Sequence, residues 1–236
     1  LTGQILTFDK PLGLTSFQLV AKVRWLLTRA MGGVKIKVGH AGTLDPLATG
    51  VMVVCTGRAT KQIDTLQAGV KEYIATLRLG ATTPSFDLEH PIDHTYATCH
   101  IDHALVEQQL KKFIGDIWQT PPAFSAVKVD GKRAYDLARK GQEVELKPKL
   151  LRIDELELLD CALAGAEKTL TLRVVCSKGT YIRALARDIG EALGSGAHLT
   201  ALRRTRVGEY RVENCMQLDE FESWLAQQTI ETEIPQ

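Results

Sequence analysis

The short stretch Gln4–Phe8 predicts a first strand. Alternating apolar and polar residues predict a second and a third strand, at Tyr73–Leu79 and Thr169–Cys176. The expected inward positions are Tyr73, Ala75, Leu77 and Leu79 in the second strand, and Leu170, Leu172, Val174 and Cys176 in the third. A continuous apolar run at Val51–Cys55 predicts a further strand that is buried on both faces.

Helical spacing of apolar residues predicts amphipathic helices between these strands. Ser16 and Asp102 are suitable N-caps for two of them, Gly32 and Gly33 end the first, and Gly194 ends a third. The predicted apolar stripes are Val20, Val23, Leu27 and Ala30; Val106, Leu110, Phe113 and Ile117; and Ile182, Leu185, Ile189 and Ala192. A short strand near Glu209–Val212 precedes a last helix, where Asp219 and Glu222 have the spacing of a capping box.

The order of these elements predicts an α+β fold. Strands and helices are mixed without regular alternation, which favours a mixed, mainly antiparallel sheet flanked by helices. Residues 120–149 interrupt this pattern with two prolines, a run of cations and one short helix near Ala134–Lys140. We expect them to form an exposed insertion within one domain that spans residues 1–236.

Composition narrows the function classes. The formal net charge of +1 means that any nucleic-acid surface must come from local clusters of cations. The odd number of cysteines, 5 in all, and their spacing argue against a disulfide framework and a zinc ribbon. Neither a secretory signal nor a membrane-spanning run is recognisable, so a cytoplasmic location is expected.

The sequence also lacks the motifs of several enzyme classes. It contains no phosphate-binding P-loop, dinucleotide-binding fingerprint, zinc-protease motif or serine-hydrolase elbow. The histidines at 90, 94, 100 and 103 with Cys99 match no metal-ligand spacing. We therefore expect no metal site and interpret this patch as a solvated loop and helix start.

The stretch Gly39–Lys61 is the strongest candidate for chemistry. Its first half, GHAGTLDPLATG, consists mainly of small residues, among which His40 and Asp45 alone have side chains suited to proton transfer or nucleophilic attack. A glycine-rich turn before a core strand is the alternative interpretation. Lys10 could similarly be a solvated turn residue, Tyr73 a core aromatic and Arg183 a surface cation.

Five blocks of the chain together resemble the bacterial tRNA pseudouridine-55 synthases, the TruB family. They run in the family's order from Gln4 to about Arg206. The blocks are GHAGTLDPLATG, Asp9-Lys10-Pro11, Lys71-Glu72-Tyr73, Pro121-Pro122 with Ser125-Ala126 and Lys128, and Ser177-Lys178-Gly179-Thr180-Tyr181-Ile182-Arg183.

This resemblance implies that one uridine of the tRNA T-arm is isomerised to pseudouridine without a metal or an organic cofactor. By motif position, Asp45 resembles the catalytic nucleophile, Arg183 its partner arginine and Tyr73 the aromatic residue that stacks on the target base. His40 resembles the residue near the extruded nucleotide. Other positions that line or support the site are matched by Lys10, Lys61, Tyr181 and Leu202.

The chemistry of these residue types agrees with that assignment. Burial disfavours an ionised carboxylate and a nearby guanidinium restores it, which gives Arg183 a physical role. Asp45 could attack the sugar C1′ or remove a C2′ proton, and the sequence does not choose between these routes. Extrusion of the base costs a few kcal/mol, which stacking on an aromatic ring can offset.

Two basic clusters are expected to contact RNA phosphates. One lies in the insertion and includes Lys128, Lys132 and Arg133, and the other comprises Arg203, Arg204 and Arg206. We expect residues 120–149 to act as a flap that orders on the RNA arm.

The chain departs from the family pattern in two ways. Many members carry a small C-terminal RNA-binding (PUA-like) domain, which is not expected within these 236 residues. His90 also stands where the family pattern has a glycine.

Two other functions remain open. The chain could be a tRNA-binding or tRNA-folding module with secondary isomerase activity, although such a module would be expected to lose Asp45, Tyr73 or Arg183. It could also be a synthase subunit guided by a separate RNA. We expect a monomer that binds tRNA and needs neither a membrane nor an obligate protein partner.

Overall fold

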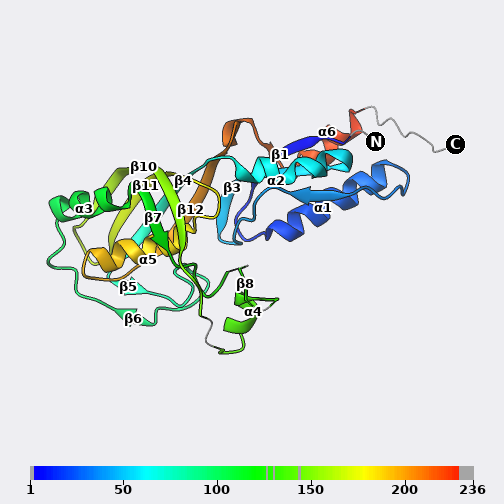
Figure 1. The fold of residues 1–236 in the computed structure, drawn as a ribbon. Coiled ribbons are helices and arrows are strands. Elements are labelled where there is room, and N and C mark those ends of the chain that lie inside the picture. The colour runs from blue at the N-terminus through cyan, green and yellow to red at the C-terminus, as the bar shows by residue number, and fades with distance from the viewer. Residues whose placement is uncertain (1–2, 126, 130, 143–144, 229–236) are drawn as a thin grey trace. The chain divides into compact units, whose positions relative to one another are not determined.

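A computed structural model describes residues 3–125, 127–129, 131–142 and 145–228 of the chain (Figure 1). It divides into two compact units, Leu1–Glu72 with Arg203–Gln236, and Tyr73–Leu202. The boundary falls within two strands, β4 (Lys71–Leu79) and β12 (Ala197–Val207).

Unit 1 is a sheet with helices on both faces. Its strands follow the order β14-β1-β3-β12, and β2 also pairs with β3. The strands β1 and β14 are parallel, whereas β1 with β3 and β2 with β3 are antiparallel. The elements are β1 (Ile5–Lys10), α1 (Ser16–Ala30), β2 (Val38–His40), β3 (Ala48–Thr56), η1 (Gly57–Gln62), α2 (Ile63–Ala68), β13 (Tyr210–Arg211), η3 (Val212–Asn214), β14 (Met216–Gln217) and α6 (Phe221–Ala226).

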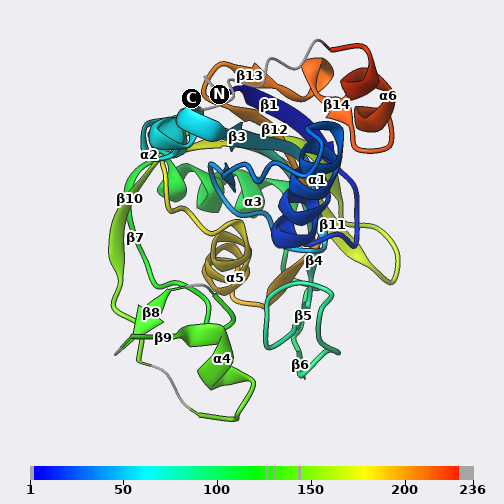
Figure 2. The same cartoon turned by 90° about the vertical axis from the view of Figure 1, so that its right-hand side faces the viewer.

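The two faces of β3 bury different side chains. Met52 and Val54 pack with residues of α1 and α6 in one core, and Val51 and Val53 pack in a second core with Ala41 and Val207. The predicted strand with two buried faces is therefore confirmed. Figure 2 shows α1 beside the strands that it covers.

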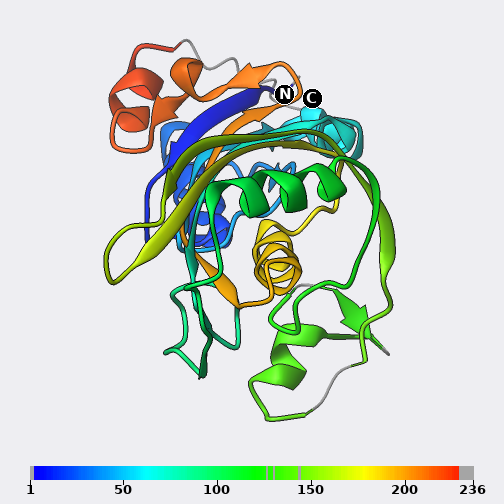
Figure 3. The same ribbon diagram turned by 90° about the vertical axis from the view of Figure 1, so that its left-hand side faces the viewer.

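Unit 2 contains a second group of sheet strands with two helices on one side. The strand order is β4-β11-β10-β7, and both β10 with β11 and β10 with β7 are antiparallel. Figure 3 shows α3 and α5 under the curved β10–β11 pair. The elements are β5 (Ala81–Thr82), β6 (His94–Thr95), α3 (His103–Leu110), η2 (Lys111–Phe113), β7 (Gly115–Gln119), β8 (Lys128–Val129), β9 (Lys132–Arg133), α4 (Ala134–Ala138), β10 (Lys149–Ala162), β11 (Lys168–Cys176) and α5 (Ile182–Ala192).

The predicted α+β class with a mainly antiparallel sheet is confirmed. The strands β4 and β11 bury the side of each strand that alternation predicted. Within the insertion, the structure contains the expected short helix as α4, and it adds the β8–β9 hairpin.

Three details of the predicted helices are wrong. Thr15, not Ser16, caps α1, because the Ser16 hydroxyl bonds the backbone of Leu44 instead. The apolar stripe of that helix ends before Ala30, which is exposed. The helix α3 stops early because Gly115 adopts φ +97°, so Ile117 lies in β7.

The predicted capping box of the last helix is also wrong. The helix α6 begins at Phe221 with Glu220 as its N-cap, and no side chain bonds its first turn. Glu222 forms an ion pair with Arg29 of α1 instead.

Candidate active site

Asp45 lies half-buried in the loop between β2 and β3, and the backbone on both sides of it is fixed. The Ser16 hydroxyl donates to the carbonyl oxygen of Leu44 and accepts from its amide, both at 2.8 Å. The amide of Gly13 donates to the carbonyl oxygen of Pro46 at 2.8 Å. The predicted placement of an aspartate on a tight loop before a buried strand is therefore confirmed.

Lys10 is buried at the end of β1 and fixes the same loop from a second direction. Its ammonium donates to the carbonyl oxygens of Pro11 at 3.0 Å, Leu14 at 2.7 Å and Pro46 at 3.4 Å. These three acceptors match the three donors of an ammonium group. Burial lowers the pKa of Lys10 to about 8; the charge of Asp45 opposes this fall and that of Arg204 adds to it. The alternative of a solvated turn lysine is wrong.

Arg204 supports the Asp45 loop from inside the protein. Its guanidinium donates to the carbonyl oxygens of Val51 at 2.9 Å, Gly42 at 3.1 Å and Thr43 at 3.4 Å. The residue is 1% exposed, so its predicted role as a phosphate contact is wrong. The backbone of Arg204 in β12 also lies very close to Gly50 in β3. Gly50 has φ +106°, and a Cβ added there would lie 2.1 Å from the carbonyl oxygen of Arg204.

The other two arginines of that predicted basic cluster, Arg203 and Arg206, have acidic partners. Arg203 forms a two-pronged contact with Asp9, at 2.8 Å and 3.1 Å. Arg206 lies 3.9 Å from the carboxylate of Glu72. The cluster therefore serves mainly to hold unit 1 together, and Arg203, which is partly exposed, keeps some access to solvent.

His40, the last residue of β2, contributes an uncharged polar group. Burial and the charge of Arg204 lower its pKa, so the ring is neutral at pH 7. Its Nδ1 is buried, and no described residue hydrogen-bonds it. A buried ring nitrogen without a partner among the described residues requires one from elsewhere, such as a water molecule or a substrate group.

In unit 2, Arg183 lies in the first turn of α5 and is buried, so the alternative of a surface cation is wrong. It donates to the carbonyl oxygen of Ser85 at 3.1 Å and to that of Phe124 at 2.9 Å. Its Nε lies 3.7 Å from the carboxylate of Asp87. Arg183 thus joins the loop after β5 to the start of the insertion.

Ser85, Asp87 and His90 form a hydrogen-bonded chain beside Arg183. The Ser85 hydroxyl donates to Asp87 at 2.6 Å, and His90 Nδ1 lies 3.0 Å from the same hydroxyl. The His90 ring also contacts the ring of Phe124, with centroids 4.5 Å apart. His90 was named from the sequence as part of the histidine patch without a metal-ligand spacing and as a departure from the family pattern, but its contact with both loops was not predicted.

Two further residues, Gln119 and Arg187, hold the start of the insertion, and neither was predicted from the sequence. The Gln119 side chain accepts from the amide of Tyr181 at 2.9 Å and donates to its carbonyl oxygen at 3.2 Å. Arg187 donates to the carbonyl oxygen of Thr120 at 2.9 Å. Arg187 follows Arg183 by four residues and so shares its helix face, which was the one available signal in the sequence.

The remaining predicted residues occupy varied environments. Tyr73 is 8% exposed at the inward side of β4, whereas Tyr181 and Leu202 are half-buried. Lys61 is exposed in η1. Lys128, Lys132 and Arg133 belong to the β8–β9 hairpin, and their side chains lie outside what the structure describes.

The structure groups the predicted residues by unit. Asp45, Lys10 and His40 belong to unit 1, and Tyr73, Tyr181, Arg183 and Leu202 belong to unit 2. The pairing of Asp45 with Arg183 stays a prediction.

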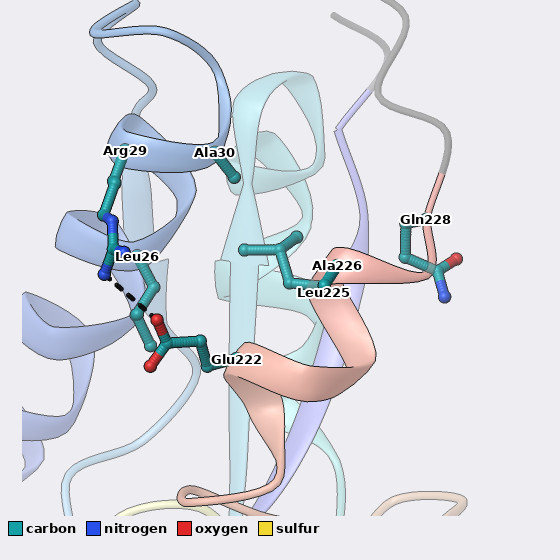
Figure 4. Close-up of a pocket in the computed structure, with 7 residues that line it drawn as sticks. All are labelled: Leu26, Arg29, Ala30, Glu222, Leu225, Ala226 and Gln228. Carbon is teal, nitrogen blue, oxygen red and sulfur yellow. Dashed lines mark hydrogen bonds and ion pairs between the residues drawn. The ribbon is translucent and has the colours of Figure 1, made fainter.

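Three other features of the described residues bear on function. No three acidic, histidine or cysteine side chains among them converge as metal ligands. No helix in the described ranges is both long and apolar enough to cross a membrane. A pocket of about 470 Å³ lies between α1 and α6 (Figure 4), and none of the predicted site residues lines it.

Comparison with known proteins shows similarity along nearly the whole chain. Residues 29–182 match the model of the TruB family pseudouridylate synthase N-terminal domain, and residues 183–235 match that of the tRNA pseudouridylate synthase B C-terminal domain. The chain is 64% identical over 231 residues to tRNA pseudouridine synthase B of Bacteroides thetaiotaomicron, covering 98% of this chain and 96% of that protein. It is 66% identical over 229 residues to the protein of that name from Phocaeicola vulgatus, covering 97% and 96%.

A solved structure is also similar. A chain of a Cbf5-Nop10-Gar1 complex has a TM-score of 0.67 and 30% identity over 93% of this chain. The chain described here spans 54% of that longer chain.

Proposed function

Since the chain belongs to the TruB family of pseudouridylate synthases and is therefore an isomerase, we propose that it converts one uridine of tRNA to pseudouridine. The proposed target is the uridine at position 55 of the T-arm, and the proposed nucleophile is Asp45. The near full-length similarity to relatives named tRNA pseudouridine synthase B supports the substrate class.

The observation that carries the proposal is the fixed backbone around Asp45. Leu44 is held by Ser16, and Pro46 is held by Gly13 and Lys10. A nucleophile must be held within a fraction of an ångström of its productive position, and a flexible surface loop would not do this. The single segment Lys10–Ser16 therefore fixes the backbone on both sides of Asp45, which is the one ionisable side chain in the loop between β2 and β3.

The proposed reaction balances within the nucleotide. A carboxylate oxygen of Asp45 attacks C1′ of the ribose, and the N1–C1′ bond breaks with its electron pair left on the uracil. The base then turns, C5 forms the new bond to C1′, and the carboxylate is released. C5 loses a proton and N1 gains one, so uridine and pseudouridine are isomers and the conversion consumes no co-reactant.

Two other residues are proposed to hold the extruded nucleotide, and a third is proposed to pair with Asp45. The ring of Tyr73 would stack on the uracil, which is worth about 1–3 kcal/mol per base. His40 would contact the extruded nucleotide through its buried Nδ1, for which no described residue is a partner. Arg183 would balance the charge of Asp45.

The insertion 120–149 is proposed to bind the RNA arm as a flap. Its root is held by hydrogen bonds from Arg183 and Arg187 to Phe124 and Thr120. Its cations, among them Lys128, Lys132 and Arg133, are suited to phosphate contacts. Protection of this segment from protease by a T-arm stem-loop would support the flap, and equal cleavage with and without RNA would count against it.

We further propose that the chain acts in the cytoplasm as a monomer, with both units in one catalytic domain, and without a metal, cofactor, guide RNA or protein partner. A chain that acts without a guide RNA and without a protein partner would differ in this respect from one that works inside a ribonucleoprotein complex.

One experiment tests the proposed function. The purified protein is incubated with a transcribed T-arm stem-loop, without added metal, cofactor or guide RNA, and pseudouridine is mapped at single-base resolution. Pseudouridine at position 55 alone is the expected result. Tight binding without any isomerisation would favour the tRNA-folding module instead.

A further inference from the structure

The helix α1 exposes two large aromatic side chains on the face that points away from its core. Leu19, Val20, Val23, Leu26 and Leu27 are buried against the sheet of unit 1. On the opposite face, Phe17 is 74% exposed and Trp25 is 58% exposed. Exposed aromatic rings are suited to stack on unpaired bases of a nucleic acid.

The stretch of sequence that contains this helix carries only positive charge, and the acidic contact that the structure shows for it is that of Glu222 of α6 with Arg29. No aspartate or glutamate occurs between Asp9 and Asp45, whereas that stretch contains six cations. Lys10 is buried, and the other five, Lys22, Arg24, Arg29, Lys35 and Lys37, are exposed. Since the whole chain carries 29 cations and 28 acidic residues, this stretch is a local excess of positive charge.

The cations and the aromatic rings alternate along the exposed face. Lys22 precedes Trp25 by three residues and Arg29 follows it by four, so both are its neighbours on the helix surface. The guanidinium carbon of Arg29 lies 5.5 Å from the centre of the Trp25 ring. Glu222 of α6 holds Arg29 in place at 3.0 Å, as Figure 4 shows.

This face begins at the loop of the proposed nucleophile. Ser16, in the first turn of α1, bonds the backbone of Leu44, and Gly13 bonds Pro46. The 15 residues of the helix extend about 22 Å from that point at about 1.5 Å per residue. A ligand that enters at Asp45 and is longer than a single nucleotide could therefore continue along α1.

We propose that Phe17, Lys22, Trp25 and Arg29, together the α1 surface, bind a part of tRNA outside the T-arm hairpin. The aromatic rings stack on unpaired bases and the cations contact phosphates. RNA fits this surface better than a lipid bilayer does, because Lys22 and Arg29 flank Trp25 where an inserting helix would be continuously apolar. The inference rests on the proposed function, which supplies tRNA as the ligand.

The test compares two RNAs with two variants of the full chain. Dissociation constants are measured for a complete tRNA transcript and for an isolated T-arm hairpin, with Phe17→Ala/Trp25→Ala and with Lys22→Gln/Arg29→Gln. We expect both variants to bind the complete tRNA about tenfold more weakly and the hairpin within twofold of wild type. The charge variant should also show a shallower dependence of binding on salt. Trp118→Ala, which removes an exposed tryptophan of β7, is the matched control.

Unchanged affinity of both variants for the complete tRNA would overturn the proposal. An equal loss for the hairpin would also overturn it, because the surface would then contact the T-arm itself. A change of mass in sedimentation with unchanged tRNA affinity would indicate a contact between two copies instead. Pseudouridine formation on the hairpin is measured in parallel, so that a failure of the proposed function is seen separately.

Discussion

His90 donates a hydrogen bond from Nδ1 to the hydroxyl of Ser85, at 3.0 Å. The direction follows from Asp87, because the Ser85 hydrogen is already donated to that carboxylate at 2.6 Å. Ser85 and Asp87 both contact Arg183. The His90 ring also packs on the ring of Phe124. Arg183 donates a hydrogen bond to the carbonyl oxygen of that same phenylalanine. His90 therefore supports both loops that hold the proposed catalytic arginine.

We predict that His90→Phe slows isomerisation while His90→Asn largely preserves it. Phenylalanine keeps a ring beside Phe124 but removes the donor, whereas the asparagine amide can replace Nδ1. A hydrogen bond of about 1 kcal/mol corresponds to about a fivefold slower single-turnover rate at saturating enzyme. His94→Phe, which changes an exposed histidine of β6, is the control. Equal rates for His90→Phe and wild type would show that isomerisation does not depend on the hydrogen bond of His90.

We predict that Gly50→Ala is far more destabilising than Gly208→Ala. Both glycines have positive φ, but an added Cβ at Gly50 meets the Arg204 backbone at 2.1 Å, whereas none lies within 4 Å at Gly208. Backbone strain alone costs on the order of 1 kcal/mol, and the clash adds several more. Urea unfolding measures both values. Similar losses at the two positions would mean that the strand pair does not depend on this close approach.

We predict that the wild type gains stability relative to Lys10→Met as the pH rises from about 8 to about 10.5. The pKa of buried Lys10 is lowered to about 8 from a usual value of 10.5. Between these values the unfolded chain binds a proton that the folded chain lacks, so the free energy of unfolding increases with pH. The gain is about 3 kcal/mol at about 1.4 kcal/mol per pKa unit. Urea titrations at several pH values check this, and a constant difference between the two proteins would contradict it.

The sequence predicts those parts of the fold in which local periodicity is regular. The strands β3, β4 and β11 show clear runs or alternation, and the structure confirms them. The long strand β10 was missed because two shifts of register, at Ile153/Glu155 and Leu158/Asp160, break its alternation. In an exposed strand with such irregularities, apolar and polar residues do not alternate with a period of two, and so the sequence gives no signal for a strand.

The sequence alone could not distinguish the role of Arg203 from that of Arg204. They are adjacent in β12, where neighbouring side chains point to opposite faces, and so Arg204 is buried while Arg203 is partly exposed. Composition alone gave both the same role as phosphate contacts. The residues around Asp45 were easier to predict, because glycine, proline and the following apolar run constrain that loop locally.

The proposed reaction depends most directly on the carboxylate of Asp45, which Asp45→Asn replaces at nearly constant shape. The measurement is pseudouridine formation at single-base resolution on a T-arm stem-loop, together with the dissociation constant for the same RNA. We predict no detectable pseudouridine, with RNA affinity within several-fold of wild type. Measurable isomerisation by Asp45→Asn would contradict the proposed mechanism.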